Sequence, residues 1–146
     1  MQKITITILF ILFSLLSYCP QGNTLVIFEA QAIKPYEAVW NATCYVESRF
    51  NPTIIGDKHL KEKSYGVAQI RQVRLDDYYL QTGIRYYEKD MFDPVKSKEV
   101  FMHYASEFYP WETEKISRSW NGGKRGMKKK STKSYYKLIL SALENN

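Results

Sequence analysis

The spacing of apolar positions predicts a long, central helix early in the chain. Residues 36–50 contain no glycine or proline, and their apolar side chains recur every three or four positions. At about 100° per residue, one face of this helix takes Ala38, Val39, Ala42, Val46 and Phe50, and a second face takes Tyr36, Trp40, Cys44 and Glu47. Pro35 fits the first helical turn. Asn51-Pro52 is expected to end the helix, because the residue before a proline avoids the α region.

The rest of the pattern predicts a mainly α fold with a small β part, in one compact helical domain. Residues 53–70 are rich in turn-forming residues and predict a loop or a small hairpin, so we expect a small β or irregular segment there. A helix over 73–82 should close at Gly83, and Asp93-Pro94 has the N-cap and N1 residues of a helix that runs to about Tyr109. Two more helices are predicted, over about 112–120 and 132–143.

The first 32 residues predict a leader for export. One charged residue is followed by an apolar run over residues 4–16, which is too short to span a bilayer of about 20 helical residues. We therefore expect a signal peptide or lipoprotein signal with a short spacer at 1–32 and the domain at 33–146. Cleavage after Ala30-Gln31-Ala32, lipid attachment at Cys19 and an uncleaved anchor remain alternatives. The expected location is periplasmic or extracellular, with membrane contact only through the signal or a lipid anchor.

Length and composition indicate one ordinary globular domain. The chain has 146 residues, of which 45% are hydrophobic and 25% charged, which excludes a large multidomain enzyme and global disorder. The formal net charge of +6 comes from one place, because residues 124–137 (the basic segment) carry seven Lys and Arg and no acid. This segment is either a solvated loop or a surface that attracts an anionic polymer or a membrane face. Nucleic-acid binding is disfavoured, since the chain is expected to be exported and has no binding motif.

Cysteine and histidine exclude several kinds of chemistry. Removal or lipidation of Cys19 would leave Cys44 without a partner, so a disulfide scaffold is excluded. Cys44 lies mid-helix beside apolar neighbours, which favours a core position over a nucleophile. His59 and His103 have no ligand-like spacing, so we expect no metal and no cofactor.

Glu47 is the best candidate for catalysis. It lies in the last turn of the predicted helix, on the side of Trp40 and Cys44, where apolar surroundings and the negative end of the helix dipole both raise a carboxyl pKa. A carboxyl that stays protonated near neutral pH is a general acid. The alternative is an exposed helix-end glutamate near Arg49.

Several short motifs resemble those of the soluble lytic transglycosylase family, which has a goose-type lysozyme-like fold. Residues 47–52 (ESRFNP) resemble its Glu-Ser-x-Phe-Asn-Pro signature, and Gly66-Val67-Ala68-Gln69 resembles Gly-Leu-Met-Gln. Asp93-Pro94 fits the start of the next long helix. Residues 119–123 (SWNGG) resemble Ala-Tyr-Asn-x-Gly, and Thr132-x-x-Tyr135-x-x-x-Ile139 resembles the closing motif. The resemblance covers roughly residues 35–143.

This resemblance implies roles for the matching residues. Glu47 would be the catalytic acid and base, and Ser48 would support it by hydrogen bonding. The remaining substrate-binding positions would be Gln69, Trp120, Asn121 and Tyr135. Ala68 replaces the usual Met, Trp120 replaces the usual Tyr, and residues 55–63 are longer and more charged than the family's equivalent.

The implied reaction cleaves the MurNAc–GlcNAc bond of peptidoglycan with formation of 1,6-anhydro-MurNAc, carried out by a monomer without cofactor. The partners would be glycan strands and, as a further partner, cell-envelope machinery. If Asp57 faces the cleft as a second carboxylate, a goose-type hydrolase of peptidoglycan or chitin is the alternative. A third alternative is a non-catalytic wall-binding component of a secretion, conjugation or phage apparatus.

Overall fold

The computed structural model describes residues 23–108 and 112–145, with side chains from residue 36 onward. The predicted leader at 1–32 lies mostly outside the described residues. Lys34–Asn146 forms one compact unit, and α2 begins before it. Within the described ranges, no helix has both the length and the apolar character that a membrane crossing requires.

The first helix of the described residues, α2, spans Asn23–Ser48, and both of its ends differ from the predicted ones. Pro35 lies inside the helix and not in its first turn, although proline lacks the N–H that an interior residue donates and its ring crowds the carbonyl four residues earlier. At the other end, Arg49 and Phe50 adopt positive φ values of 54° and 62°. This left-handed turn points Phe50 outward, so its side chain is 49% exposed. The periodicity had placed Phe50 on the apolar face of the helix, and this prediction is wrong.

A small antiparallel sheet follows α2, as expected for residues 53–70. Its strands β1 (Ile55–Gly56), β2 (Ser64–Tyr65) and β3 (Ile70–Arg71) lie in that order. Ile55 pairs with Tyr65, and Ser64 pairs with Arg71. Gly66 has φ +73°, and a Cβ there would collide with the carbonyl oxygen of Met91, so only glycine fits this turn.

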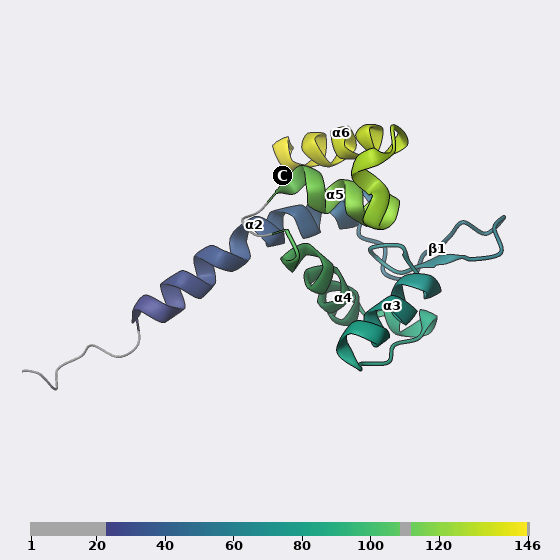
Figure 1. Cartoon of the computed structure of the whole chain (residues 1–146), viewed down its shortest axis with the longest axis horizontal. Coiled ribbons are helices and arrows are strands. Elements are labelled where there is room, and N and C mark those ends of the chain that lie inside the picture. The colour runs from purple at the N-terminus through teal and green to yellow at the C-terminus, as the bar shows by residue number, and fades with distance from the viewer. Residues whose placement is uncertain (1–22, 109–111, 146) are drawn as a thin grey trace, which may run out of the picture. The chain divides into compact units, whose positions relative to one another are not determined.

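The four predicted later helices are present within a few residues of their expected ends, which confirms the mainly helical fold. They are α3 (Gln72–Thr82), α4 (Pro94–Ser106), α5 (Thr113–Gly122) and α6 (Ser131–Glu144). Gly83 ends α3 with φ 76°, and the Asp93 side chain accepts a hydrogen bond from Val95 N at 2.8 Å. Two short 3₁₀ helices were not predicted, η1 (Glu88–Phe92) and η2 (Gly123–Lys128), and η2 replaces the loop expected there. Figure 1 shows α5 and α6 side by side, with α3 and the sheet together at another end of the unit.

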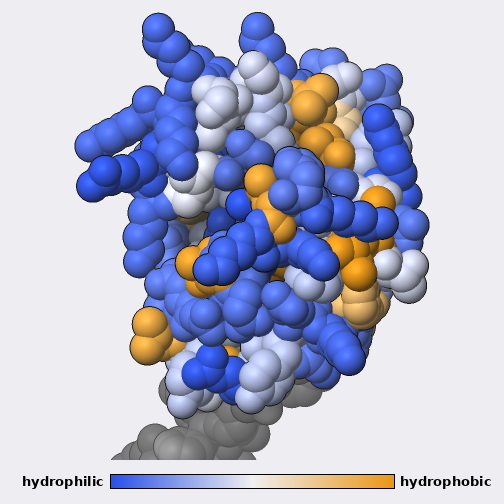
Figure 2. Space-filling model, turned by 90° about the vertical axis from the view of Figure 1, so that its right-hand side faces the viewer, coloured by the Kyte–Doolittle hydropathy of each residue, from blue (hydrophilic) through white to orange (hydrophobic). Residues whose placement is uncertain are grey.

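The core forms where α2, α4 and α5 meet. Phe101 of α4 is fully buried between Trp40 of α2 and Trp120 of α5, with ring centroids 5.3 and 5.0 Å away. Cys44 is buried in the same core, and burial raises the pKa of its thiol to about 12. The face seen in Figure 2 is mostly hydrophilic, with its apolar side chains in small separate groups.

Candidate active site

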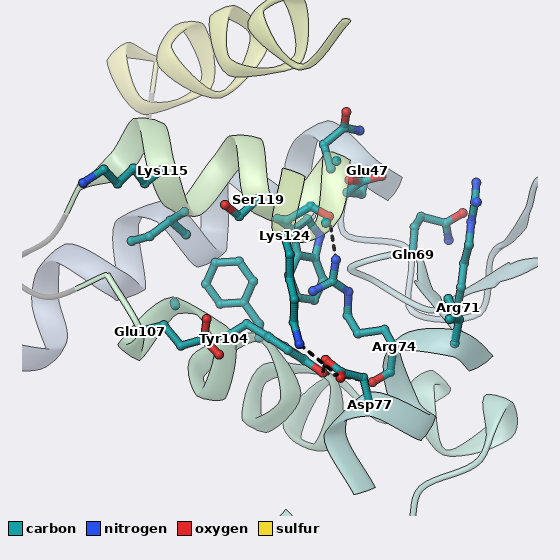
Figure 3. A pocket seen from close by; sticks show the side chains of 18 of the residues that line it. Glu47, Gln69, Arg71, Arg74, Asp77, Tyr104, Glu107, Lys115, Ser119 and Lys124 are labelled. Carbon is teal, nitrogen blue, oxygen red and sulfur yellow. Dashed lines mark hydrogen bonds and ion pairs between the residues drawn. The ribbon is translucent and has the colours of Figure 1, made fainter. Parts of the chain in front are cut away.

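A cavity of about 1160 Å³ opens beside the C-terminal end of α2. Its lining comes from the end of α2, the sheet, α3, α4, α5 and η2, so the fold gathers segments that are far apart in the sequence. One side is formed by the polar wall, which we define as Asp57, Ser64, Gln69 and Arg71. The other side is formed by the aromatic wall, which we define as Phe101, Tyr104 and Trp120. In Figure 3, Gln69 and Arg71 lie on one side, Tyr104 on the other, and Arg74 between them.

Glu47 lines this cavity, and its carboxyl accepts a hydrogen bond from Tyr135. The hydroxyl of Tyr135, a buried residue of α6, donates a hydrogen bond to Glu47 Oε1 at 2.8 Å. Burial raises the pKa of Glu47 to about 7, and the negative charge of Asp57 adds to the rise. The Tyr135 hydrogen bond, Arg74 and Arg71 act in the opposite direction. A carboxyl with such a pKa is partly protonated at neutral pH and can both give and take a proton.

The contact between Glu47 and Tyr135 also affects the pKa of the tyrosine. Burial and the neighbouring Glu47 charge hold the pKa of Tyr135 well above its ordinary value. Tyr135 therefore stays a neutral donor, and its proton fixes one oxygen of the Glu47 carboxyl. The other oxygen of Glu47 is left for chemistry.

Ser48 is buried, and its hydroxyl contacts backbone carbonyl groups. Its hydroxyl oxygen lies 2.8 Å from the carbonyl oxygen of Val67 and 3.1 Å from that of Cys44. These contacts fasten the end of α2 to the segment that leads into Gln69. Neither Ser48 nor Tyr135 is among the cavity-lining residues, whereas Glu47, Gln69, Trp120 and Asn121 are.

The polar wall is a closed network of hydrogen bonds. Gln69, at a positive φ of 52°, donates from Nε2 to Gly66 O at 2.8 Å. Its Oε1 accepts from the Ser64 hydroxyl, also at 2.8 Å. A Cβ on Gly56 would collide with this Oε1, so the glycine leaves the room that the Gln69 side chain occupies. The network gives Gln69 one orientation before any ligand binds.

Asp57 belongs to the same wall and faces the cavity. Its carboxylate accepts a hydrogen bond from Arg71 Nη2 at 2.7 Å and lies 3.1 Å from the Ser64 hydroxyl oxygen. The Arg71 hydrogen bond first, and the nearby Ser64 hydroxyl after it, hold the pKa of Asp57 below its ordinary value. Asp57 is therefore a second, ionised carboxylate on the cavity that Glu47 lines.

The aromatic wall is built around Arg74, which sequence reasoning missed. The guanidinium lies 4.3 Å from the ring centroid of Trp120 and 4.8 Å from that of Tyr104. It also donates to the Trp120 carbonyl oxygen at 2.8 Å, which is one of the free carbonyls at the end of α5. Its position in the first turn of α3, five residues after Gln69, was the one available signal. Tyr104, whose hydroxyl donates to Asp77 at 3.0 Å, gave no signal beyond helical periodicity.

No group of three or more His, Cys, Asp and Glu side chains in residues 23–108 and 112–145 is arranged to hold a metal ion. The cavity itself offers the Glu47 carboxyl, whose pKa is raised, the ionised Asp57 carboxylate beside aligned hydrogen-bond donors, and the further carboxyl groups of Asp77 and Glu107.

Comparison with known proteins gives one finding. A family model described as the transglycosylase SLT domain matches residues 26–140, which is more than half of the chain. The match begins inside the segment that we predicted as leader and spacer. No curated protein and no solved structure matches.

Proposed function

Because the chain belongs to the transglycosylase SLT domain family, which acts on the bacterial cell wall, we propose that it is a peptidoglycan lytic transglycosylase. The reaction would cleave the β-1,4 bond between MurNAc and GlcNAc and leave 1,6-anhydro-MurNAc. The single observation that supports this most is Glu47, which lines the cavity, has a pKa of about 7 and is held by Tyr135 at 2.8 Å.

One carboxyl is enough for both halves of this reaction. Protonated Glu47 gives its proton to the glycosidic oxygen as the bond to the anomeric carbon breaks, and the 2-acetamido group assists at that carbon. Ionised Glu47 then takes the proton of the C6 hydroxyl, whose oxygen closes the anhydro ring, so no water is consumed. Gln69, Trp120 and Asn121 contact the sugars in this proposal. Tyr135 and Ser48 hold Glu47 in place.

The products of digestion test the proposal. Mass spectrometry of digested sacculi should show muropeptides ending in anhydro-MurNAc. Glu47→Gln should lower turnover by about 10²- to 10⁴-fold, since it removes the general acid and keeps a side chain that accepts the Tyr135 hydrogen bond. Residual activity within tenfold of the wild type would refute the role of Glu47, and sacculi left undigested by the wild type would favour a non-catalytic wall-binding component.

Hydrolysis is the second candidate, because Asp57 lines the same cavity and is ionised. In an inverting hydrolase a carboxylate in this position activates a water molecule against the anomeric carbon. Asp57→Asn separates the two reactions: it should abolish hydrolysis but leave transglycosylation largely intact. Reducing ends in place of anhydro ends in the wild-type digest would establish hydrolysis.

We also propose export, with a signal or lipoprotein signal in residues 1–32 and a monomeric domain at 33–146. The compact unit that begins at Lys34 supports this boundary. N-terminal sequencing of the exported protein tests it, and a mass increase at Cys19 would identify lipid attachment. Envelope machinery stays a proposed partner.

A further inference from the structure

One buried hydroxyl near Glu47 has no hydrogen-bond partner. Thr43 is 0% exposed, and among the buried side-chain nitrogen and oxygen atoms of the described residues only its Oγ1 has none. Other buried hydroxyls in these residues are bonded: Ser97 donates to Met91 O at 2.8 Å and Ser117 to Thr113 O at 2.7 Å. A buried hydroxyl without a hydrogen-bond partner lowers the free energy of unfolding, so its presence needs an explanation.

Thr43 lies one helical turn before Glu47 on α2. Residues four apart share a helix face, so the two side chains are neighbours. Tyr135 of α6 meets both of them. Its hydroxyl donates to Glu47 Oε1 at 2.8 Å. The Thr43 hydroxyl is near enough to lower the pKa of Tyr135, although the two hydroxyls are outside hydrogen-bond geometry.

The Thr43 proton is uncommitted. A helical threonine commonly donates to the carbonyl four residues earlier, here that of Val39, and this bond is not made. The acceptor beside it is the Tyr135 oxygen, whose own proton is already directed at Glu47. The hydroxyls can therefore form a chain in one direction only, from Thr43 to Tyr135 to Glu47.

We propose that Thr43 is a positioning residue whose hydroxyl bonds to Tyr135 when Glu47 gives up its proton. This rests on the proposed function of Glu47. Ionised Glu47 draws the Tyr135 proton more strongly than protonated Glu47 does, which makes the Tyr135 oxygen a better acceptor. The Thr43 bond is then stronger in the ionised state than in the resting state. An interaction of this kind accelerates turnover without tightening substrate binding.

Thr43→Val tests the proposal, because it removes the hydroxyl and nearly keeps the shape of the side chain. With soluble glycan strands of defined length, kcat should fall about 3- to 10-fold, the effect of one hydrogen bond, while KM stays unchanged. The pKa of Glu47 should rise, because the Tyr135 hydrogen bond that lowers it is weakened, so activity should be lost at a higher pH than in the wild type. Asp57, Arg71 and Arg74, the other groups that act on Glu47, are unchanged in this variant. Thr43→Ser should restore the wild-type profile.

A double-mutant cycle with Tyr135→Phe shows whether Thr43 acts through the tyrosine. In the Tyr135→Phe background, Thr43→Val should have no further effect on kcat. Ser97→Ala is the matched control: it removes a buried hydroxyl that lies outside the cavity lining and should lower stability without moving the pH profile. Thr43→Val itself should not destabilise the fold, since it removes an unpartnered polar group.

Two outcomes overturn the proposal. The first is a wild-type kcat and pH profile for Thr43→Val, and the second is an effect of Thr43→Val that persists in full without the Tyr135 hydroxyl. Each leaves the proposed function intact as long as Glu47→Gln is inactive. An active Glu47→Gln refutes the proposed function itself, independently of Thr43.

Discussion

The two walls of the cavity are built by different kinds of interaction. On the polar wall, Asp57, Ser64, Gln69 and Arg71 are fixed by hydrogen bonds between side chains and by two residues with positive φ, Asp57 and Gln69. On the aromatic wall, Trp120, Phe101 and Tyr104 are fixed by ring contacts with each other or with Arg74, and two of the three rings are also buried core. The polar wall can change at little cost in stability, whereas the aromatic wall holds the site and the fold together.

The largest expected effect is on the aromatic wall. Trp120 is 7% exposed, packs on Phe101 and carries Arg74 against its ring. Trp120→Ala should lower the free energy of unfolding by about 3–5 kcal/mol, as for other buried aromatic truncations. Urea denaturation measures this loss. Trp120→Tyr, which keeps an aromatic ring, should lose clearly less.

The matched change on the polar wall is Asp57→Asn. The Asp57–Arg71 ion pair is half exposed, so its loss should cost less than about 1 kcal/mol. Equal losses for Trp120→Ala and Asp57→Asn would contradict the difference between the walls.

An intermediate effect is expected at Glu47, where the two walls meet. Burial raises its pKa from the ordinary 4.5 to about 7. Between these values the native state binds more protons than the unfolded state, so stability should fall as pH rises from 4.5 to 7 and then level off. The loss corresponds to at most roughly 3 kcal/mol.

Glu47→Gln removes that titration. The variant should be more stable than the wild type above pH 7, while its stability relative to the wild type falls as the pH is lowered to 4.5. Thermal unfolding from pH 4 to pH 8.5 measures both trends. Parallel curves for the two proteins across this range would show that the folded-state pKa of Glu47 is not raised.

Much of the fold was readable from the sequence, because helix boundaries depend on local signals. Asp93-Pro94 and Gly83 act within one turn of the chain: α4 begins at Pro94 and α3 ends before Gly83, as these residues predict. The predicted helix end at Phe50 was wrong because Arg49 and Phe50 form a left-handed turn, which ends α2 two residues earlier, at Ser48. Pro35 was misplaced because proline weakens a helix without always ending it.

The site was predictable where a motif carries it and not elsewhere. Gln69, Asn121 and Glu47 come from short motifs and line one cavity. Arg74 and Thr43 have no motif. The rings beside Arg74 come from α4 and α5, and Tyr135 beside Thr43 comes from α6, so spacing alone cannot reveal these contacts. The direction of Asp57 likewise depends on Arg71 and on the sheet register.

The smallest effect on stability is expected from the basic segment, at one rim of the cavity. Lys124 and Lys129 line the cavity, and Lys124 is 81% exposed and lies 3.6 Å from Asp77. In the described residues, the exposed Lys128, Lys130 and Lys133 have no ion-pair partner. We expect this surface to attract the acidic wall substrate, and not to stabilise the fold.

Replacing Lys128, Lys130 and Lys133 together by Gln should weaken binding to sacculi several-fold at low salt, with a stability change below about 1 kcal/mol. Added salt should remove the difference, because it screens exposed charges. The control replaces Lys58, Lys61 and Lys63, which are also exposed and, like the three test residues, lie outside the cavity lining, so both variants carry the same net charge. Equal binding of the two variants at low salt would mean that the net charge of the protein, and not this surface, attracts it to sacculi. Neither variant changes the polar or the aromatic wall of the cavity, so both should cleave short soluble glycans at the wild-type rate. This result separates the attraction to sacculi from the chemistry in the cavity.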